Sequence, residues 1–310
     1  MRVARARRWL GALVALGLAA PAALAQAETD TGAATEPVAT EPAPVEPAPA
    51  EPVAPAPVPA PRPRPVARKP VPSTGRLDKT EDTVAGGIHW RVRTDAGAIH
   101  VWVPPGYDRA TAGTVVYVHG YYTDADGAWK GHDLARQFKA SGQNAIFIVP
   151  DAPSGNGEAV KWPALTDLRR AITRANIKLP DGPTVVVGHS GAFRTVMQWV
   201  DHKAVAQVIL LDALYGGQRA FDEFIGTGKR AQHHKLIVVG ADTAQGSSAF
   251  AKKYPFAVVR DRMPASSGEF SKREKSAKLL YVRSQYGHMQ IVTSGKVLPV
   301  LLRLTPLRHR

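Results

Sequence analysis

The sequence contains no cysteine. A chain without thiols forms no disulfide, uses no thiolate as a nucleophile, and carries no lipid on a cysteine after a signal peptide. It also lacks a histidine pair with zinc-helix spacing, an aspartate run typical of a calcium loop, and a glycine-rich phosphate loop after its first strand. We therefore expect a protein that is stabilised by packing alone and that uses neither a metal nor a cofactor.

Negative charge is scarce, since 26 aspartates and glutamates stand against 40 lysines and arginines, for a formal net charge of +14. Much of the basic excess follows Asp201, including the runs "SKREKSAK" and "RLTPLRHR". Such a surface favours anionic partners, and we expect an anionic cell-envelope polymer. A basic face that is merely solvated is the alternative interpretation. No nucleic-acid partner is expected, because no binding motif occurs and no aromatics are interleaved with the basic runs.

The first 25 residues carry the pattern of a secretory signal peptide. Four arginines precede the apolar run from Trp9 to Ala20, and small residues precede the expected cleavage before Gln26. The run is too short to span a bilayer comfortably. Arg7 and Arg8 leave twin-arginine export open, and an uncleaved membrane anchor is the alternative. We expect an exported bacterial protein, periplasmic, envelope-associated or extracellular, without stable membrane insertion after cleavage.

Residues 26–73 are dominated by proline, alanine and glutamate and contain too little apolar surface to form a core. This composition predicts an extended, disordered linker. The remaining residues, 74–310, are long enough to bury one core and form the predicted domain.

Strand-like and helix-like segments alternate along this domain. A hairpin is expected from 88–93 and 98–103, and buried strands at 114–119, 144–149, 184–187, 207–211, 235–239 and 278–283. Helices are expected at 127–140, 164–175, from Ser190 to Val200, 220–224 and 247–253, with a last one near the C-terminus. The alternation predicts a mostly parallel sheet with helices on both faces, and ligands at the carboxyl ends of its strands.

One stretch, "TVVVGHSGAF" at 184–193, ends an apolar β-branched run on a serine between small residues. A serine hydroxyl needs an adjacent base to become a nucleophile, and the base needs a carboxylate to orient it. Ser190 is therefore the candidate nucleophile, and capping the following helix is its alternative role.

The segment "GHSGA" resembles the G-x-S-x-G nucleophile elbow of the α/β-hydrolase superfamily, with alanine in the last place. The stretches "VWVPPGYD" and "TVVYVHGYYTDADGAW" resemble the opening of secreted esterases of that superfamily, so the likeness covers essentially the whole domain. It implies an α/β-hydrolase fold with a mostly parallel central sheet flanked by helices. The connection from Asp212 to Lys235 is short, which predicts a minimal cap and an open site.

The resemblance also implies a Ser-His-Asp triad in the chain order serine, acid, histidine. Ser190 is the implied nucleophile and His288 the implied base. Asp212 and Asp242 each follow a predicted strand and both remain candidates for the acid, with Asp212 slightly preferred.

The backbone N–H groups of Tyr121 and Gly191 are the implied oxyanion hole, and we assign Tyr122 and His189 to substrate binding. The long connection from 243 to 276 is a candidate lid. The implied activity is that of an exported serine carboxylic ester hydrolase that works through an acyl-enzyme on a small or polymeric ester. An acyltransferase with the same triad and a non-catalytic envelope-binding module on a hydrolase scaffold are the alternatives.

Overall fold

The computed structural model describes residues 77–228 and 233–310. The predicted signal peptide (1–25) and linker (26–73) lie outside the described residues. Within the described part, no helix is both long enough and apolar enough to cross a membrane.

The strands are β1 (Lys79–Val84), β2 (Gly87–Thr94), β3 (Gly97–Val103), β4 (Gly113–Val118), β5 (Ala145–Pro150), β6 (Thr184–His189), β7 (Val205–Leu211), β8 (Lys235–Gly240), β9 (Val258–Arg260) and β10 (Leu279–Arg283). The α-helices are α1 (Ala125–Gly131), α2 (Leu134–Ser141), α3 (Leu165–Arg174), α4 (Phe193–Val196), α5 (Gln218–Thr227), α6 (Ala244–Lys252), α7 (Lys272–Ser276), α8 (Gln290–Thr293) and α9 (Leu298–Leu302), and two short 3-10 helices lie at Ser190–Ala192 and Ser267–Glu269.

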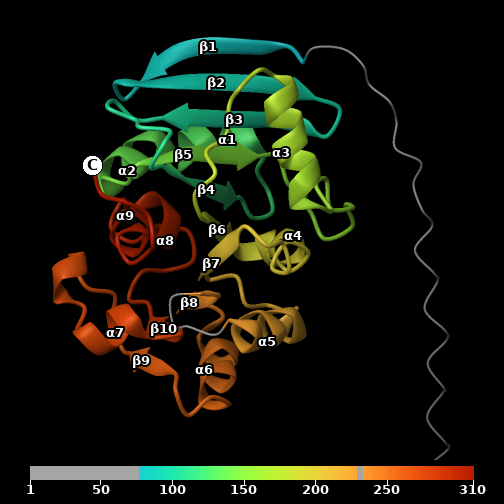
Figure 1. Ribbon diagram of the computed structural model, residues 1–310. Coiled ribbons are helices and arrows are strands. Elements are labelled where there is room, and N and C mark those ends of the chain that lie inside the picture. The colour runs from blue at the N-terminus through green and yellow to red at the C-terminus, as the bar shows by residue number, and fades with distance from the viewer. Residues whose placement is uncertain (1–76, 229–232) are drawn as a thin grey trace, which may run out of the picture. The chain divides into compact units, whose positions relative to one another are not determined.

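The ten strands found in the described residues form one sheet in the order β1-β2-β3-β5-β4-β6-β7-β8-β10-β9 (Figure 1). The pairs β1/β2, β2/β3 and β3/β5 are antiparallel, and the pairs from β5 to β9 are parallel. The mostly parallel sheet predicted from the sequence is thus confirmed, and so is the β2/β3 hairpin. Because β6, β7, β8 and β10 are consecutive neighbours and parallel, the loops that follow them emerge at one edge.

Successive residues along the central strands face two separate cores. In β4, Val116 and Val118 belong to one apolar cluster, whereas Val115 and Tyr117 belong to the other. Helices α3, α4, α5 and α6 cover the first cluster, and α1, α2, α8 and α9 cover the second (Figure 1). Both faces of these strands are therefore buried, which explains why their sequences are continuous apolar runs and do not alternate between apolar and polar residues.

The structure departs from the expected elements in four places. The edge of the sheet is β1, which the sequence analysis missed, so the β2/β3 hairpin lies one strand inside. The expected helix 127–140 is two helices, broken at Asp133, which has a left-handed backbone (φ 49°). The expected helix from Ser190 to Val200 contains only a 3-10 turn and the four-residue α4. The candidate lid, 243–276, instead supplies α6 to one face and β9 to the far edge of the sheet.

We expect the removal of one buried ring from the core on the α2 face to lower the free energy of unfolding substantially. Phe138 is fully buried and stacks on Phe147 with ring centroids 4.4 Å apart. Phe138→Ala is expected to lower the free energy of unfolding by about 3–5 kcal/mol, because it removes apolar contacts and leaves a cavity. Phe256→Ala is the control, because that ring is 49% exposed, and it should cost less than about 1 kcal/mol. Urea denaturation measures both, and equal costs would contradict the packing described.

Candidate active site

The last residue of β6 is His189, and Ser190 follows it in a sharp turn into α4. Ser190 has φ 54°, a left-handed conformation that a non-glycine residue rarely adopts. Tyr122 (φ 64°) and Asp212 (φ 48°) share this feature, and each follows a neighbouring strand of the sheet. Strained backbone of this kind is typical of functional sites, where packing elsewhere maintains it.

Two glycines beside Ser190 are required because neighbouring side chains pack against their α-carbons. A Cβ on Gly188 would lie 2.8 Å from Cγ2 of Val196, and one on Gly191 would lie 2.4 Å from the ring of Tyr121. Strand, turn and helix therefore meet without room for a methyl group, which explains the small residues on both sides of the serine.

Two loops bring a base and an acid to this serine. Nε2 of His288, in the loop after β10, lies 2.9 Å from Oγ of Ser190. Nδ1 of the same ring lies 2.6 Å from Oδ2 of Asp212, which follows β7. A carboxylate only accepts, so Nδ1–H donates to Asp212, and Nε2 is left to accept the hydroxyl proton of Ser190.

A strained serine turn between a strand and a helix of a mostly parallel sheet, followed in the chain by an aspartate and a histidine that contact it in series, defines one architecture. The chain has the fold of the α/β-hydrolase superfamily.

No family model and no curated relative matches the sequence. Among solved structures, it is similar to an S-formylglutathione hydrolase from Agrobacterium tumefaciens, at 13% identity over 74% of this chain and 98% of that chain, with a TM-score of 0.43. A feruloyl esterase module from Clostridium thermocellum, complexed with sinapinate, matches at 15% identity over 78% and 93%, with a TM-score of 0.47. A fluorophosphonate-binding serine hydrolase from Staphylococcus aureus matches at 10% identity over 74% and 98%, also with a TM-score of 0.47. Likeness at this level says nothing about the substrate.

The carboxylate of Asp212 is fully buried and surrounded by donors. Oδ1 accepts from the N–H groups of Ala241 and Thr243 and from the hydroxyl of Thr243, at 2.9, 2.9 and 2.6 Å. Oδ2 accepts from the N–H of Asp242 at 3.1 Å in addition to His288. Burial raises the pKa of Asp212, but the His288, Thr243 and Ala241 donors outweigh it, so the pKa lies well below its ordinary value.

Asp242, the other candidate acid, lies close to the imidazole but does not hold it. Its Oδ2 is 3.9 Å from Nδ1 of His288, beyond a hydrogen bond, and its side chain is 65% exposed. The hydrogen bond to Asp212 raises the pKa of His288, burial lowers it, and the charges of Asp212 and Asp242 raise it further. The net effect is a pKa above the ordinary value for histidine.

Within the described residues, the same three side chains are the one group with the composition of a metal site, with ligand atoms within 4.8 Å of one another. Both oxygens of Asp212 already accept from protein donors, which leaves no free lone pair directed at an ion. The donor set therefore fits an orienting acid and does not fit a metal ligand.

The predicted oxyanion residues lie on either side of the serine. The ring of Tyr121 packs over Gly191, and the backbone N–H of Tyr121 has no backbone acceptor in the described part of the chain. Arg194, one turn beyond Ser190, was not among the predicted site residues. Its guanidinium donates to Oη of Tyr121 at 3.1 Å and to the carbonyls of Asn156 and Glu158 at 2.8 Å each.

The two residues assigned to substrate binding differ in exposure. Tyr122 is 97% exposed, and its N–H donates to the carbonyl of Ser154 at 2.8 Å. His189 is only 2% exposed and lies against the ring of His288. A side chain so deeply buried offers no surface to a substrate, so the assignment of His189 to substrate binding does not fit the structure.

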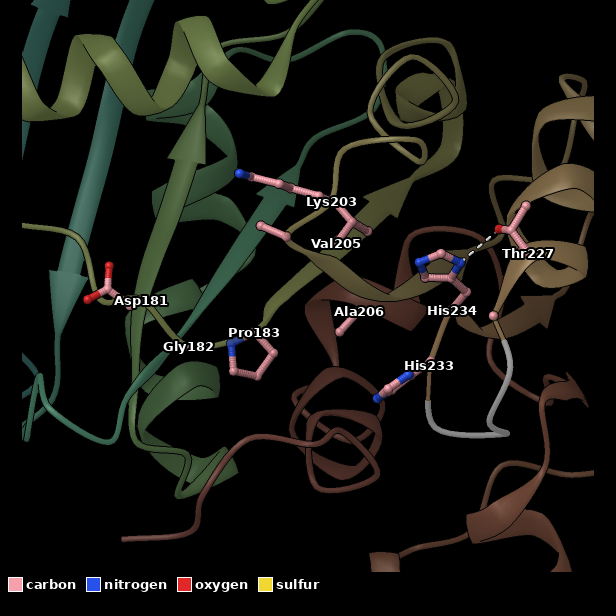
Figure 2. Close-up of a pocket in the computed structure, with 11 residues that line it drawn as sticks. Asp181, Gly182, Pro183, Lys203, Val205, Ala206, Thr227, His233 and His234 are labelled. Atoms are coloured by element: carbon pink, nitrogen blue, oxygen red, sulfur yellow. Dashed lines mark hydrogen bonds between the residues drawn. The ribbon is translucent and has the colours of Figure 1, made fainter.

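A separate recess of about 450 Å³ lies at the opposite ends of the strands (Figure 2). Its lining includes Pro183 before β6, Lys203 before β7 and His234 before β8. Ser190, Asp212 and Asp242 follow the far ends of these same three strands, so the recess is not part of the site described above.

The close approach at the elbow gives a paired prediction. Gly188→Ala places a methyl group against Val196, a stiff β-branched residue, and should lower the free energy of unfolding by about 1–3 kcal/mol. Gly226→Ala, in α5, meets nothing within 4 Å and should raise it by up to about 1 kcal/mol through helix propensity. Thermal or urea unfolding of both variants checks the contrast, and a neutral Gly188→Ala would contradict the tight turn.

Proposed function

We propose that this protein is a serine hydrolase that cleaves carboxylic esters through an acyl-enzyme. The supporting observation is the unbroken hydrogen-bonded series from Asp212 through His288 to Ser190. In that series the base has its acceptor nitrogen directed at the hydroxyl and its donor nitrogen directed at a buried charge. This is the arrangement by which a weak nucleophile is activated.

In the proposed reaction, Oγ of Ser190 attacks the acyl carbonyl carbon while Nε2 of His288 takes the hydroxyl proton. The tetrahedral intermediate collapses when His288 returns this proton to the leaving alcohol oxygen, and the acyl group remains as an ester on Ser190. A water molecule then attacks that ester, again giving a proton to Nε2, and the acid product leaves as Ser190 recovers its proton. Asp212 stabilises the imidazolium formed in both halves.

The negative oxygen of each tetrahedral intermediate needs donors that are already in place. We propose the backbone N–H groups of Tyr121 and Gly191 for this role. Support comes from the packing of the Tyr121 ring over Gly191 and from Arg194, which ties Tyr121 to residues 156 and 158. Tyr122, the most exposed aromatic beside these donors, is proposed to contact the substrate.

We further propose that the enzyme works after export and that its basic surface associates with an anionic envelope polymer. The support is the signal-like pattern of residues 1–25 for export and the net charge of +14 for the association. Salt-dependent binding to such a polymer that is unaffected by Ser190→Ala would separate this association from catalysis.

The nucleophile is tested by reaction of the full chain with a fluorophosphonate, followed by peptide mapping, and by assay with short acyl esters. Label is expected on Ser190, and Ser190→Ala should lose it and lower kcat/KM by about 10³-fold or more. Ser276→Ala, on an exposed serine of α7, should behave as wild type. Absence of both label and turnover in the wild type would exclude the enzyme and favour the binding module.

The two aspartates are distinguished by pH profiles. Activity requires neutral His288, so kcat/KM should fall as pH drops through its raised pKa. Asp242→Asn removes a charge that raises this pKa, and should move the acid limb to lower pH by a fraction of a unit with kcat kept within about threefold. Asp212→Asn should lower kcat by about 10³-fold to 10⁴-fold. A larger loss for Asp242→Asn than for Asp212→Asn would make Asp242 the acid.

A further inference from the structure

The histidine that precedes the nucleophile lies directly against the base. His189 ends β6, and its ring lies on that of His288 with centroids 4.7 Å apart and planes at 37°. A third imidazole, His132, meets His189 edge-on at 5.8 Å, and Tyr117 lies within hydrogen-bond distance of His132 (2.9 Å). Three imidazoles thus form a column from the site into the core. The proposed mechanism uses only the outermost.

A hydrogen bond joins the side chain of His189 to the main chain of the base. Nε2 of His189 lies 3.3 Å from the backbone carbonyl oxygen of His288. A carbonyl oxygen only accepts, so Nε2 of His189 carries the proton. Its Nδ1 faces the backbone of Gly120, where an added Cβ would be 3.3 Å away. The surroundings therefore select the Nε2–H tautomer.

Burial, more than the surrounding charges, keeps His189 neutral. Burial lowers its pKa to about 3, helped by His288 and His132, and the hydrogen bond to the His288 carbonyl and the charge of Asp212 oppose this less strongly. Burial likewise lowers the pKa of His132 to about 4. When His288 accepts a proton, the rings beneath it remain uncharged. His189 can therefore hold the main chain of the base without repelling the imidazolium.

We infer that His189 is a positioning residue, a neutral Nε2–H donor that holds the main chain of His288 so that its Nε2 stays within reach of Ser190. The inference rests on the proposed function. Its physical reason is that His288 lies in the loop after β10, about a hundred residues from the elbow in the chain. The end of β6 therefore positions both reacting groups. Its backbone holds Ser190, and the side chain of His189 holds the main chain of His288.

Two substitutions separate the donor from the ring. His189→Phe keeps a ring of similar size but loses the donor. His189→Gln loses the ring but places an amide N–H near the position of Nε2. His234→Phe is the matched control, because His234 also stacks on a neighbouring ring, at 4.7 Å from Phe224, but lies at the opposite ends of the strands.

The full chain and these variants are assayed with a short acyl ester and with a fluorophosphonate. His189→Phe should lower kcat and the labelling rate about 10-fold to 100-fold with KM changed less than about threefold, since only the reacting groups are displaced. His189→Gln should recover about half of that loss on a logarithmic scale, and His234→Phe should leave kcat unchanged. Equal kcat in wild type and His189→Phe, no recovery in His189→Gln, or an effect confined to KM would overturn the inference.

A second readout does not depend on activity. Histidine ¹⁵N NMR of the full chain should show His189 as the Nε2–H tautomer without titration from pH 5 to pH 8, while His288 titrates. An Nδ1–H tautomer, or titration of His189 in this range, would overturn the inference even if the enzyme is active. Loss of turnover in the wild type with the expected tautomer would instead count against the proposed function alone.

Discussion

The site depends on the compensation of one buried charge. The carboxylate of Asp212 has no exposed surface, and an unpaired charge in that position would cost several kcal/mol. Its donors come from the loop after β8 and from His288 after β10, so the same hydrogen bonds that satisfy the charge also hold three loops together. This is possible because β7, β8 and β10 are adjacent and parallel. Orientation of the imidazole is therefore a consequence of satisfying Asp212.

Three of the seven non-glycine residues with positive φ in the described part of the chain lie at this same edge of the sheet. Tyr122, Ser190 and Asp212 have positive φ values, at a cost on the order of 1–3 kcal/mol each. The strands beneath them are buried on both faces and rich in valine, which gives the packing that can maintain such conformations. The turn at Ser190 also depends on glycines that let strand and helix approach closely. The packing of these strands and glycines therefore maintains the strained conformation of Ser190, whose side chain is half-buried.

The sequence predicted the elements that are buried and missed those that are not. Runs such as 185–187, three valines within β6, are apolar because helices cover both sides of the strand, and that signal is local. β1 has the sequence KTEDTV and is largely exposed, so its sequence alone indicates a loop. It is a strand because it pairs with β2. β9 has three residues and is a strand only because β10 lies beside it. The break at Asp133 does have local signals, Gly131 at the end of α1 and Asp133 itself before α2, which the expected single helix ran through.

The residues of the candidate site were likewise predicted only in part. Ser190 and His288 could be named because the elbow is a local motif and the order of the triad runs along the chain. The choice between Asp212 and Asp242 could not be made, because both follow adjacent strands and only the distances to His288, 2.6 and 3.9 Å, separate them. His189 was misassigned for the same reason. Its position beside the nucleophile suggested contact with substrate, whereas its partner is a carbonyl 99 residues away. A local motif thus identifies candidate reacting groups, whereas long-range packing decides which neighbours hold them.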